Sequence, residues 1–361
     1  MLKTRVCELL NIRYPIVQAA MAWVSNAEMV AAISNAGGLG TLGPNAGATT
    51  ITRDAYETGE RLRAQIRKVR ELTDKPFAVN IVVPGPGEEG FSEATLKVAT
   101  EENVPVAIVS QGSPKVYTER LKQAGLKVLH VVANQKHAST AESAGVDAVI
   151  TSGTEGGGHS GLDMLTNFIL VPLVADAVRI PVITGGGVGD ARGLVAALAL
   201  GAEGIYMGTR FIATKECPVH QNSKQALLQS EATDTVAIRH KRASIEEVKD
   251  VQSEMRFGSV RLLLNERARQ LVELEAQGKS PEEIMKLYLS PPPGYEGKDV
   301  NRTMASAIYG DIVHGSVAAG QVVGLIKDIP TCRELVERIM ASAEEILNRL
   351  SGYKTLVGGY R

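Results

Sequence analysis

The sequence contains few of the residues that would define a cross-linked, metal-bound or membrane protein. Only 3 of its 361 residues are cysteine, and Cys7, Cys217 and Cys332 are far apart with no CxxC pair. A disulfide framework and a zinc knuckle are therefore both unsupported, and a reducing compartment fits. Because no apolar run approaches the ~20 residues that span a bilayer, we expect a soluble, cytoplasmic protein without membrane association.

An excess of charge of one sign is also lacking. The chain has 39 basic and 40 acidic residues, which gives no electrostatic case for binding nucleic acid or an anionic membrane. We therefore expect a small-molecule substrate, with a homodimer as one option for the assembly. Cys217 and His220 could form a metal pair, but two more ligands would be needed, so we expect no metal site.

Short β-like runs alternate with helical patterns along the chain up to Phe211. Such alternation is typical of parallel βα units, and eight of them close into a barrel whose strand carboxyl ends carry the chemistry. The sequence thus predicts an α/β fold, a (β/α)8 TIM barrel. The eight strands are expected at Tyr14–Ala20, Leu39–Leu42, Phe77–Val83, Val106–Ser110, Lys127–Val132, Asp147–Ser152, Pro181–Gly185 and Gly204–Gly208.

After Phe211 the pattern changes to long, charged helical segments, His220–Gly278 and Pro281–Leu289, with no strand evident. We interpret this part as a helical appendage after the eighth strand. The barrel domain would then comprise residues 1–216 and 311–361, and the appendage, residues 217–310, would cover the active site.

A glycine-rich run with one histidine follows the sixth predicted strand, reading TSGTEGGGHSG from Thr151 to Gly161. Glycines let a backbone approach a ligand closely, and a histidine can exchange a proton near neutral pH. A solvated loop histidine is the alternative, but the place at a strand end favours a catalytic His159. The run also matches GxGxxG, the dinucleotide-binding motif of Rossmann domains. That motif, however, should open a helix in the first βα turn of its domain.

Two more glycine clusters follow the seventh and eighth predicted strands, at Gly185–Gly187 and at Met207-Gly208-Thr209. Barrels frequently bind phosphate with the loops after these two strands. The pair of clusters therefore predicts a cofactor that carries a phosphate.

Polar residues end or interrupt two other predicted strands. Gln18 begins the stretch QAAMAW, which places small residues at the barrel mouth, and Asn80 interrupts an apolar strand. A ring with donors and acceptors on one edge could satisfy a buried amide, and structural hydrogen bonds could do so equally well.

These motifs, in this order, resemble the nitronate monooxygenase (formerly 2-nitropropane dioxygenase) family of FMN-containing TIM barrels. The same superfamily includes flavin-dependent enoyl-ACP reductases and NADH:quinone reductases. The matching segments are Tyr14–Met21, Asn35–Leu39, Phe77–Asn80, Gly153–Gly161, Pro181–Gly187, Met207–Phe211 and Ala319–Leu325.

The resemblance implies FMN as the cofactor, with NAD(P)H as an optional co-substrate. Residues near the flavin ring would be Ala20, Met21, Ala22, Asn80, Gly158 and Gln321. Those around the phosphate would be Gly185, Gly186, Gly187, Met207, Gly208 and Thr209. His159 would face the substrate as the catalytic base.

The implied activity is an FMN-dependent oxidoreductase that oxidises alkyl nitronates with O2 to a carbonyl compound and nitrite. The alternative is an NAD(P)H-dependent flavin reductase that acts on an enoyl thioester or a quinone. An inosine-phosphate-type barrel would need a loop cysteine, and none stands at a predicted strand end before Cys217. A binding protein that holds the cofactor without turnover is a further alternative.

Overall fold

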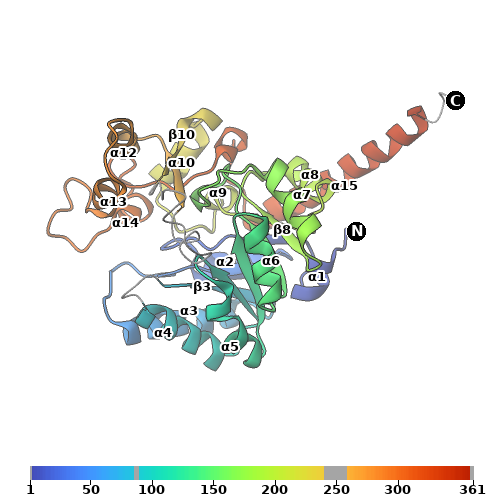
Figure 1. The fold of residues 1–361 in the computed structure, drawn as a ribbon, viewed down its shortest axis with the longest axis horizontal. Helices are drawn as coiled ribbons and strands as arrows, with labels where there is room; N and C mark the ends of the chain where they lie inside the picture. Colours follow the sequence, from blue (N-terminus) through green and yellow to red (C-terminus); the bar gives the residue numbers. More distant parts are fainter. Residues whose placement is uncertain (1, 85–88, 240–257, 358–361) are drawn as a thin grey trace.

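A computed structural model describes residues 2–84, 89–239 and 258–357. Eight parallel strands form one curved sheet in the order β1-β9-β8-β6-β5-β4-β3-β2 (Figure 1). The two outer strands also meet, because Val17 of β1 pairs with Leu39, one residue before β2, in a parallel bridge. The amide of Gln18 donates to the carbonyl of Leu39 over 2.8 Å at this closure. The predicted (β/α)8 barrel is therefore confirmed.

All eight predicted strands are present, each within about two residues of its expected bounds at most ends. The barrel strands are β1 Ile16–Gln18, β2 Gly40–Leu42, β3 Phe77–Val82, β4 Val106–Ser110, β5 Lys127–Val132, β6 Ala148–Thr151, β8 Val182–Gly185 and β9 Gly204–Met207. Their inward side chains, among them Val17, Ala78, Ile108, Leu129 and Ile183, fill the barrel as one buried cluster. The outward side chains pack under the helices, so the strands are buried on both faces.

Several helices of the barrel begin at polar residues that accept a hydrogen bond from the first turn. Asn26, Asp54, Asn134 and Asp190 cap four of them in this way, as their short polar side chains predict. The barrel helices are α1 Arg5–Leu10, α2 Ala27–Asn35, α3 Ala55–Leu72, α4 Glu89–Glu101, η1 Pro114–Val116, α5 Thr118–Gln123, α6 Gln135–Ser143, α7 Asn167–Ala177, α8 Ala191–Ala199 and α9 Thr209–Ile212.

The appendage is not purely helical, which corrects the prediction for residues 217–310. Strands β10 (Thr235–Arg239) and β11 (Ser259–Leu263) pair antiparallel, and β11 also pairs with β7 (Gly158–Ser160). The partner of β11 thus comes from the glycine-rich run about 100 positions earlier, which local sequence patterns do not reveal. Residues 240–257, which we expected to be helical, lie outside the described residues.

The other elements of the appendage are helical, as predicted. They are α10 Gln221–Gln229, η2 Ala232–Asp234, α12 Glu266–Ala276, α13 Pro281–Leu289 and α14 Arg302–Ala307. Helices α12 to α14 gather at one end of the molecule, opposite to the end where the last helix runs outward (Figure 1).

The chain returns to the barrel through η3 (Gln321–Leu325) and ends in α15 (Cys332–Val357), which packs against α8 and α2. None of the helices in the described ranges is both long and apolar enough to cross a membrane.

Candidate active site

The glycine clusters predicted from sequence lie against one another at the carboxyl ends of the strands. A Cβ built on Gly186 would lie 2.9 Å from the carbonyl oxygen of Gly153 and from the amide nitrogen of Gly156. A Cβ on Gly157 would lie 2.6 Å from the amide nitrogen of Gly320. Since real Cβ atoms avoid such distances, these positions require glycine, and backbone alone forms this part of the mouth.

Four backbone amides at this place have no hydrogen-bond partner among the residues that the structure describes. They belong to Gly186, Gly187, Gly208 and Thr209, and we refer to them as the amide cluster. Gly186 and Gly187 have φ values of +90° and +72°, so their amides turn out of the strand direction. Unpartnered amides in successive glycine positions form a concave site for an anion. The cluster therefore fits a phosphate group.

Asn167, which sequence reasoning missed, fixes the loop that carries half of the amide cluster. Its side-chain amide donates to the carbonyls of Gly185 and Gly186, each over 2.8 Å. Its Oδ1 accepts from the hydroxyl of Thr151 over 2.9 Å, and its backbone amide donates to Glu155 over 2.8 Å. The available signal was a polar residue that begins a helix directly after the glycine-rich run.

The loop after β1 lies beside Gly208, because a Cβ there would be 3.5 Å from the sulfur of Met21. The amide of Ala20 donates to the phenol oxygen of Tyr206 over 2.9 Å, and Ala22 is exposed. Burial raises the pKa of Tyr206 to about 12, so the phenol stays protonated and keeps its hydrogen to donate. Sequence analysis missed Tyr206, although it belongs to the predicted eighth strand, between Gly204 and Met207.

Asn80 points into the barrel with only 7% of its surface exposed. Its side-chain amide donates to the carbonyl of Ile108 over 2.9 Å and to the hydroxyl of Ser110 over 3.1 Å. Among the described residues, no donor reaches its Oδ1. Structural hydrogen bonds therefore account for the side-chain NH2 of Asn80, whereas its Oδ1 is available to a ligand.

His159 lies in strand β7, although we expected it in a glycine-rich loop after the sixth predicted strand. It pairs in register with Val260 of β11, so the appendage holds its backbone. His159 is exposed to solvent, and desolvation by the neighbouring protein, followed by the charge of Arg302, lowers the pKa of its ring to about 4. A histidine with a pKa below its ordinary range is neutral at pH 7 and can accept a proton.

Arg302, another residue missed from sequence, faces this region from the first turn of α14. Its guanidinium lies 3.4 Å from the ring centre of Tyr288, and its buried Nε has no hydrogen-bond partner in the described part of the chain. No carboxylate of the described residues forms an ion pair with it. Helix α14 packs on the loop after β1 through Met304 and Trp23. An unpaired cation near the mouth favours an anionic ligand.

Gln321 lies where the chain re-enters the barrel. Its backbone amide donates to the carbonyl of Glu155 over 2.9 Å, and the amide of Gly320 donates to the hydroxyl of Thr209 over 3.0 Å. The segment after the appendage is therefore bound to the glycine-rich run and to the cluster at Met207–Thr209. The Gln321 side chain is exposed.

Arg261 of β11 joins the appendage to the glycine-rich run. Its Nε donates to the carbonyl of Thr154 over 2.8 Å, and its Nη1 donates to the hydroxyl of Thr235 over 3.1 Å. This buried arginine fixes the position of the loop that leads to His159.

Cys217 and His220 do not form a metal site. Burial raises the pKa of the Cys217 thiol to about 11, and His220 instead caps α10 by accepting a hydrogen bond from the amide of Asn222. Within the described ranges, no group of three or more potential metal ligands is present.

These features define an α/β barrel with glycine-rich loops at the carboxyl ends of its strands, and comparison with known proteins gives its family. A family model described as nitronate monooxygenase matches residues 3–342. The chain therefore belongs to the nitronate monooxygenase family, and it is an oxidoreductase.

Three relatives illustrate the range of the family. A "(3aS,4S,5R,7aS)-5-hydroxy-7a-methyl-1-oxo-octahydro-1H-indene-4-carboxyl-CoA dehydrogenase" of Rhodococcus jostii is 35% identical, with 98% of this chain and 99% of the relative covered. A "probable nitronate monooxygenase" of Staphylococcus saprophyticus is 38% identical, with 65% and 75% covered. The structure of FabK from Thermotoga maritima superposes with a TM-score of 0.81 at 36% identity, covering 98% and 100% of the two chains.

Proposed function

We propose that this protein is an FMN-dependent oxidoreductase in which the barrel holds the flavin and the appendage supplies the groups that meet the substrate. The amide cluster is the observation that carries this proposal, since four amides without a protein partner can donate together to the oxygens of a phosphate. We further propose that residues 217–310 cover the mouth, with β11 and α14 as the covering elements.

The residues present fit FMN. The amides of Gly186, Gly187, Gly208 and Thr209 would hold its phosphate, and the Oδ1 of Asn80 and the segment Ala20–Ala22 would lie against its ring. When bound, the flavin supplies the capacity to take two electrons from a donor and to pass them on. The protein positions the reactants and stabilises their charges.

His159 would act as a base. Its pKa of about 4 leaves the ring neutral above pH 5, so it can take a proton from the carbon of a neutral nitroalkane. The charge of Arg302 would then stabilise the anion that forms. This pair suits the oxidation of an alkyl nitronate with O2 to a carbonyl compound and nitrite.

A second candidate is the oxidation or reduction of a carrier-bound thioester, with NAD(P)H as the donor in the reductive direction. The full-length match to a relative named as a carboxyl-CoA dehydrogenase favours it, because the match to the Staphylococcus saprophyticus relative covers only 65% of this chain.

Anaerobic mixing of the flavin-loaded protein with each donor separates the candidates. Bleaching of the flavin absorbance by a nitronate, and not by NADH or NADPH, supports the first reaction. Bleaching by NADH or NADPH, followed by reoxidation with an enoyl thioester, supports the second. A purified protein that neither contains nor binds flavin would overturn both.

A further inference from the structure

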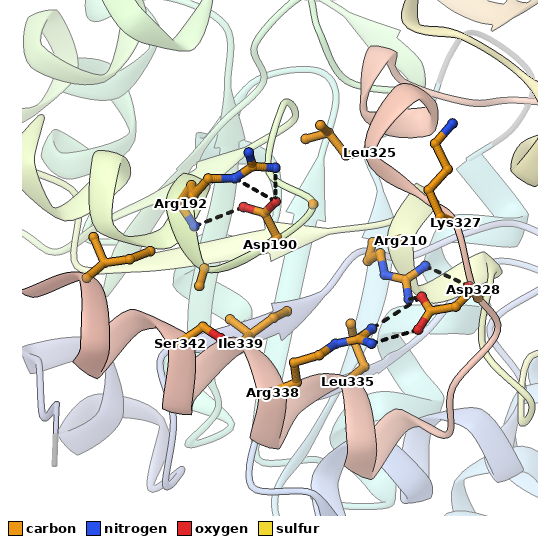
Figure 2. Close-up of a pocket in the computed structure, with 13 residues that line it drawn as sticks. Asp190, Arg192, Arg210, Leu325, Lys327, Asp328, Leu335, Arg338, Ile339 and Ser342 are labelled. Carbon is orange, nitrogen blue, oxygen red and sulfur yellow. Dashed lines mark hydrogen bonds and ion pairs between the residues drawn. The ribbon is translucent and has the colours of Figure 1, made fainter.

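A cavity lies outside the barrel mouth, and we refer to it as the side cavity (Figure 2). Its volume is about 510 Å³, and it is bounded by the start of α8, the segment 325–328 and helix α15. Ligand pockets typically have ~300–1,000 Å³. The side cavity is connected in sequence to the amide cluster, since Gly189 lies two residues after Gly187 and Arg210 follows Thr209.

The side cavity carries more positive than negative charge. Its walls contain four cationic side chains, Arg192, Arg210, Lys327 and Arg338, and two carboxylates, Asp190 and Asp328. Lys327 makes one more contact, with Glu231 at 3.8 Å, but both side chains are exposed and such a pair is weak. The walls as a whole therefore attract anions.

One carboxylate serves two arginines on the wall next to α15. Arg210, which is only 3% exposed, donates to the Oδ1 of Asp328 over 2.6 Å, and Arg338 donates to the Oδ2 over 2.7 Å. Two arginines therefore share one carboxylate, because both Arg210 and Arg338 pair with Asp328. Buried charges are ordinarily paired. This group of three thus retains one net positive charge at the cavity wall.

The opposite wall carries a single arginine that pairs with one carboxylate. Arg192 donates to Asp190 over 3.0 Å from its Nε, and 69% of its side chain remains exposed. Arg192 and Arg338 are therefore the two guanidinium groups that an entering anion would reach first (Figure 2).

Apolar residues line the rest of the side cavity. Leu335, Ile339 and Ile346 of α15 face it on one side, and Leu325, which is 52% exposed, lies at its edge. A flat ring could pack against such a wall while attached phosphates meet the arginines. The combination distinguishes this cavity from a site for a simple inorganic anion.

We propose that the side cavity binds a phosphorylated adenosine group, with its phosphates between Arg192 and Arg338 and its base against the apolar side of α15. Such a group occurs in coenzyme A and in nicotinamide dinucleotide phosphate. Either source would place the large, non-reacting end of a substrate or co-substrate on the outer wall of the barrel, beside the loops that carry the amide cluster.

Calorimetric titration of the flavin-loaded protein tests this proposal with adenosine 3′,5′-bisphosphate, adenosine 2′,5′-bisphosphate and adenosine as probes. We expect a bisphosphate to bind at least about tenfold more tightly than adenosine, because charge-assisted contacts to arginine exceed neutral ones. A preference for the 3′,5′ isomer indicates coenzyme A, and a preference for the 2′,5′ isomer indicates the dinucleotide.

The double variant Arg192→Gln/Arg338→Gln should lose at least about tenfold in bisphosphate affinity. Arg53→Gln/Lys97→Gln is the matched control, because it removes the same charge from two exposed residues outside the side cavity. Arg53 lies just before α3, and Lys97 lies in α4. Unfolding temperature and flavin content should stay at the parent values in both variants. Equal affinity of adenosine and both bisphosphates, or unchanged affinity in the Arg192→Gln/Arg338→Gln variant, would overturn the proposal.

This inference is independent of the reaction proposed above. The titration measures binding and not turnover, and an unchanged flavin spectrum shows that the probe has not entered the flavin site. A failure of the titration would leave the flavin chemistry intact, and an inactive flavin would leave the titration valid.

Discussion

The barrel and the appendage build the candidate active site from different parts of the chain. The barrel contributes backbone, with glycines at Gly157 and Gly186 where a Cβ would collide with neighbouring backbone. The appendage contributes side chains with charge, Arg261 and Arg302, and the strand that holds His159. Barrel backbone can bind the same phosphate whatever the substrate, whereas charged side chains discriminate among substrates. We therefore assign cofactor binding to the barrel and substrate selection to the appendage.

The largest expected effect comes from breaking the barrel side of this division. Gly186→Ala places a Cβ 2.9 Å from two backbone atoms of the glycine-rich run and forces an alanine into a φ of +90°. We expect flavin content, and with it all activity, to fall by at least about tenfold, because the amide cluster can no longer keep its geometry. Flavin absorbance per mole of protein measures this directly.

Gly145→Ala is the matched control for backbone strain. Gly145 has a φ of +88°, but a Cβ there would meet nothing within 4 Å. Gly145→Ala should lose roughly 1 kcal/mol of stability from the positive φ alone, and Gly186→Ala should lose at least as much. Only Gly186→Ala should lose flavin, and equal flavin content in the two variants would exclude the Gly186 loop from the site.

The second prediction concerns the histidine that the two regions share. His159→Ala should leave flavin bound and reduce turnover by about 10²–10⁴, the range for loss of a positioned acid or base. The loss should be greater for a neutral nitroalkane, which must be deprotonated, than for a preformed nitronate. His314→Ala, at a half-buried histidine just after the appendage that faces Asp311, is the control. Parent rates of His159→Ala with both substrates would make His159 a structural residue.

The third prediction concerns the appendage side. Arg302→Gln removes the cation near His159 and should raise KM for an anionic substrate by about tenfold, with flavin content unchanged. The same change should raise the pKa of His159, because Arg302 helps to lower it. Activity that depends on neutral His159 is lost as pH falls through this pKa, so the acidic limb of the pH profile should move to higher pH.

Arg302→Lys keeps the charge and is the control for this effect. It should return the acidic limb of the pH profile to its parent position and bring KM close to the parent value. If Arg302→Gln leaves both KM and the pH profile unchanged, the anion does not lie at Arg302 and its stacking on Tyr288 is its whole role.

The smallest effect on activity is expected from a second histidine with a low pKa, which separates stability from catalysis. His130 of β5 is fully buried outside the barrel interior, and burial lowers its pKa to about 4. The unfolded chain therefore binds a proton near pH 6.5 that the folded protein binds only near pH 4. Stability should fall by on the order of 3 kcal/mol as pH decreases through this window.

Denaturant unfolding at pH 7 and at pH 4.5 measures this loss. His130→Leu should flatten the dependence without a change in turnover, because the side chain lies outside the barrel interior. An unchanged pH dependence in His130→Leu would show that other groups cause the loss.

The barrel could be predicted from sequence because its strands and helices alternate locally. The glycine clusters were visible for the same reason, as each stands directly after a strand. Pairing of β7 with β11 could not be predicted, since Gly158 and Arg261 meet only in the folded chain. Arg302 and Asn167 were also missed, because an arginine or an asparagine near a helix start ordinarily serves the surface or a cap. Their significance depends on what they contact.

The most direct test of the division between barrel and appendage compares the affinities of the apoprotein for FMN and for riboflavin, which has the same ring but no phosphate. If the amide cluster holds the phosphate, FMN should bind at least about 100-fold more tightly, since several charge-assisted hydrogen bonds are lost with riboflavin. Gly186→Ala should abolish that difference, and Arg302→Gln should leave it intact. Equal affinities for FMN and riboflavin in the parent protein would contradict the assignment of the cofactor to the barrel backbone.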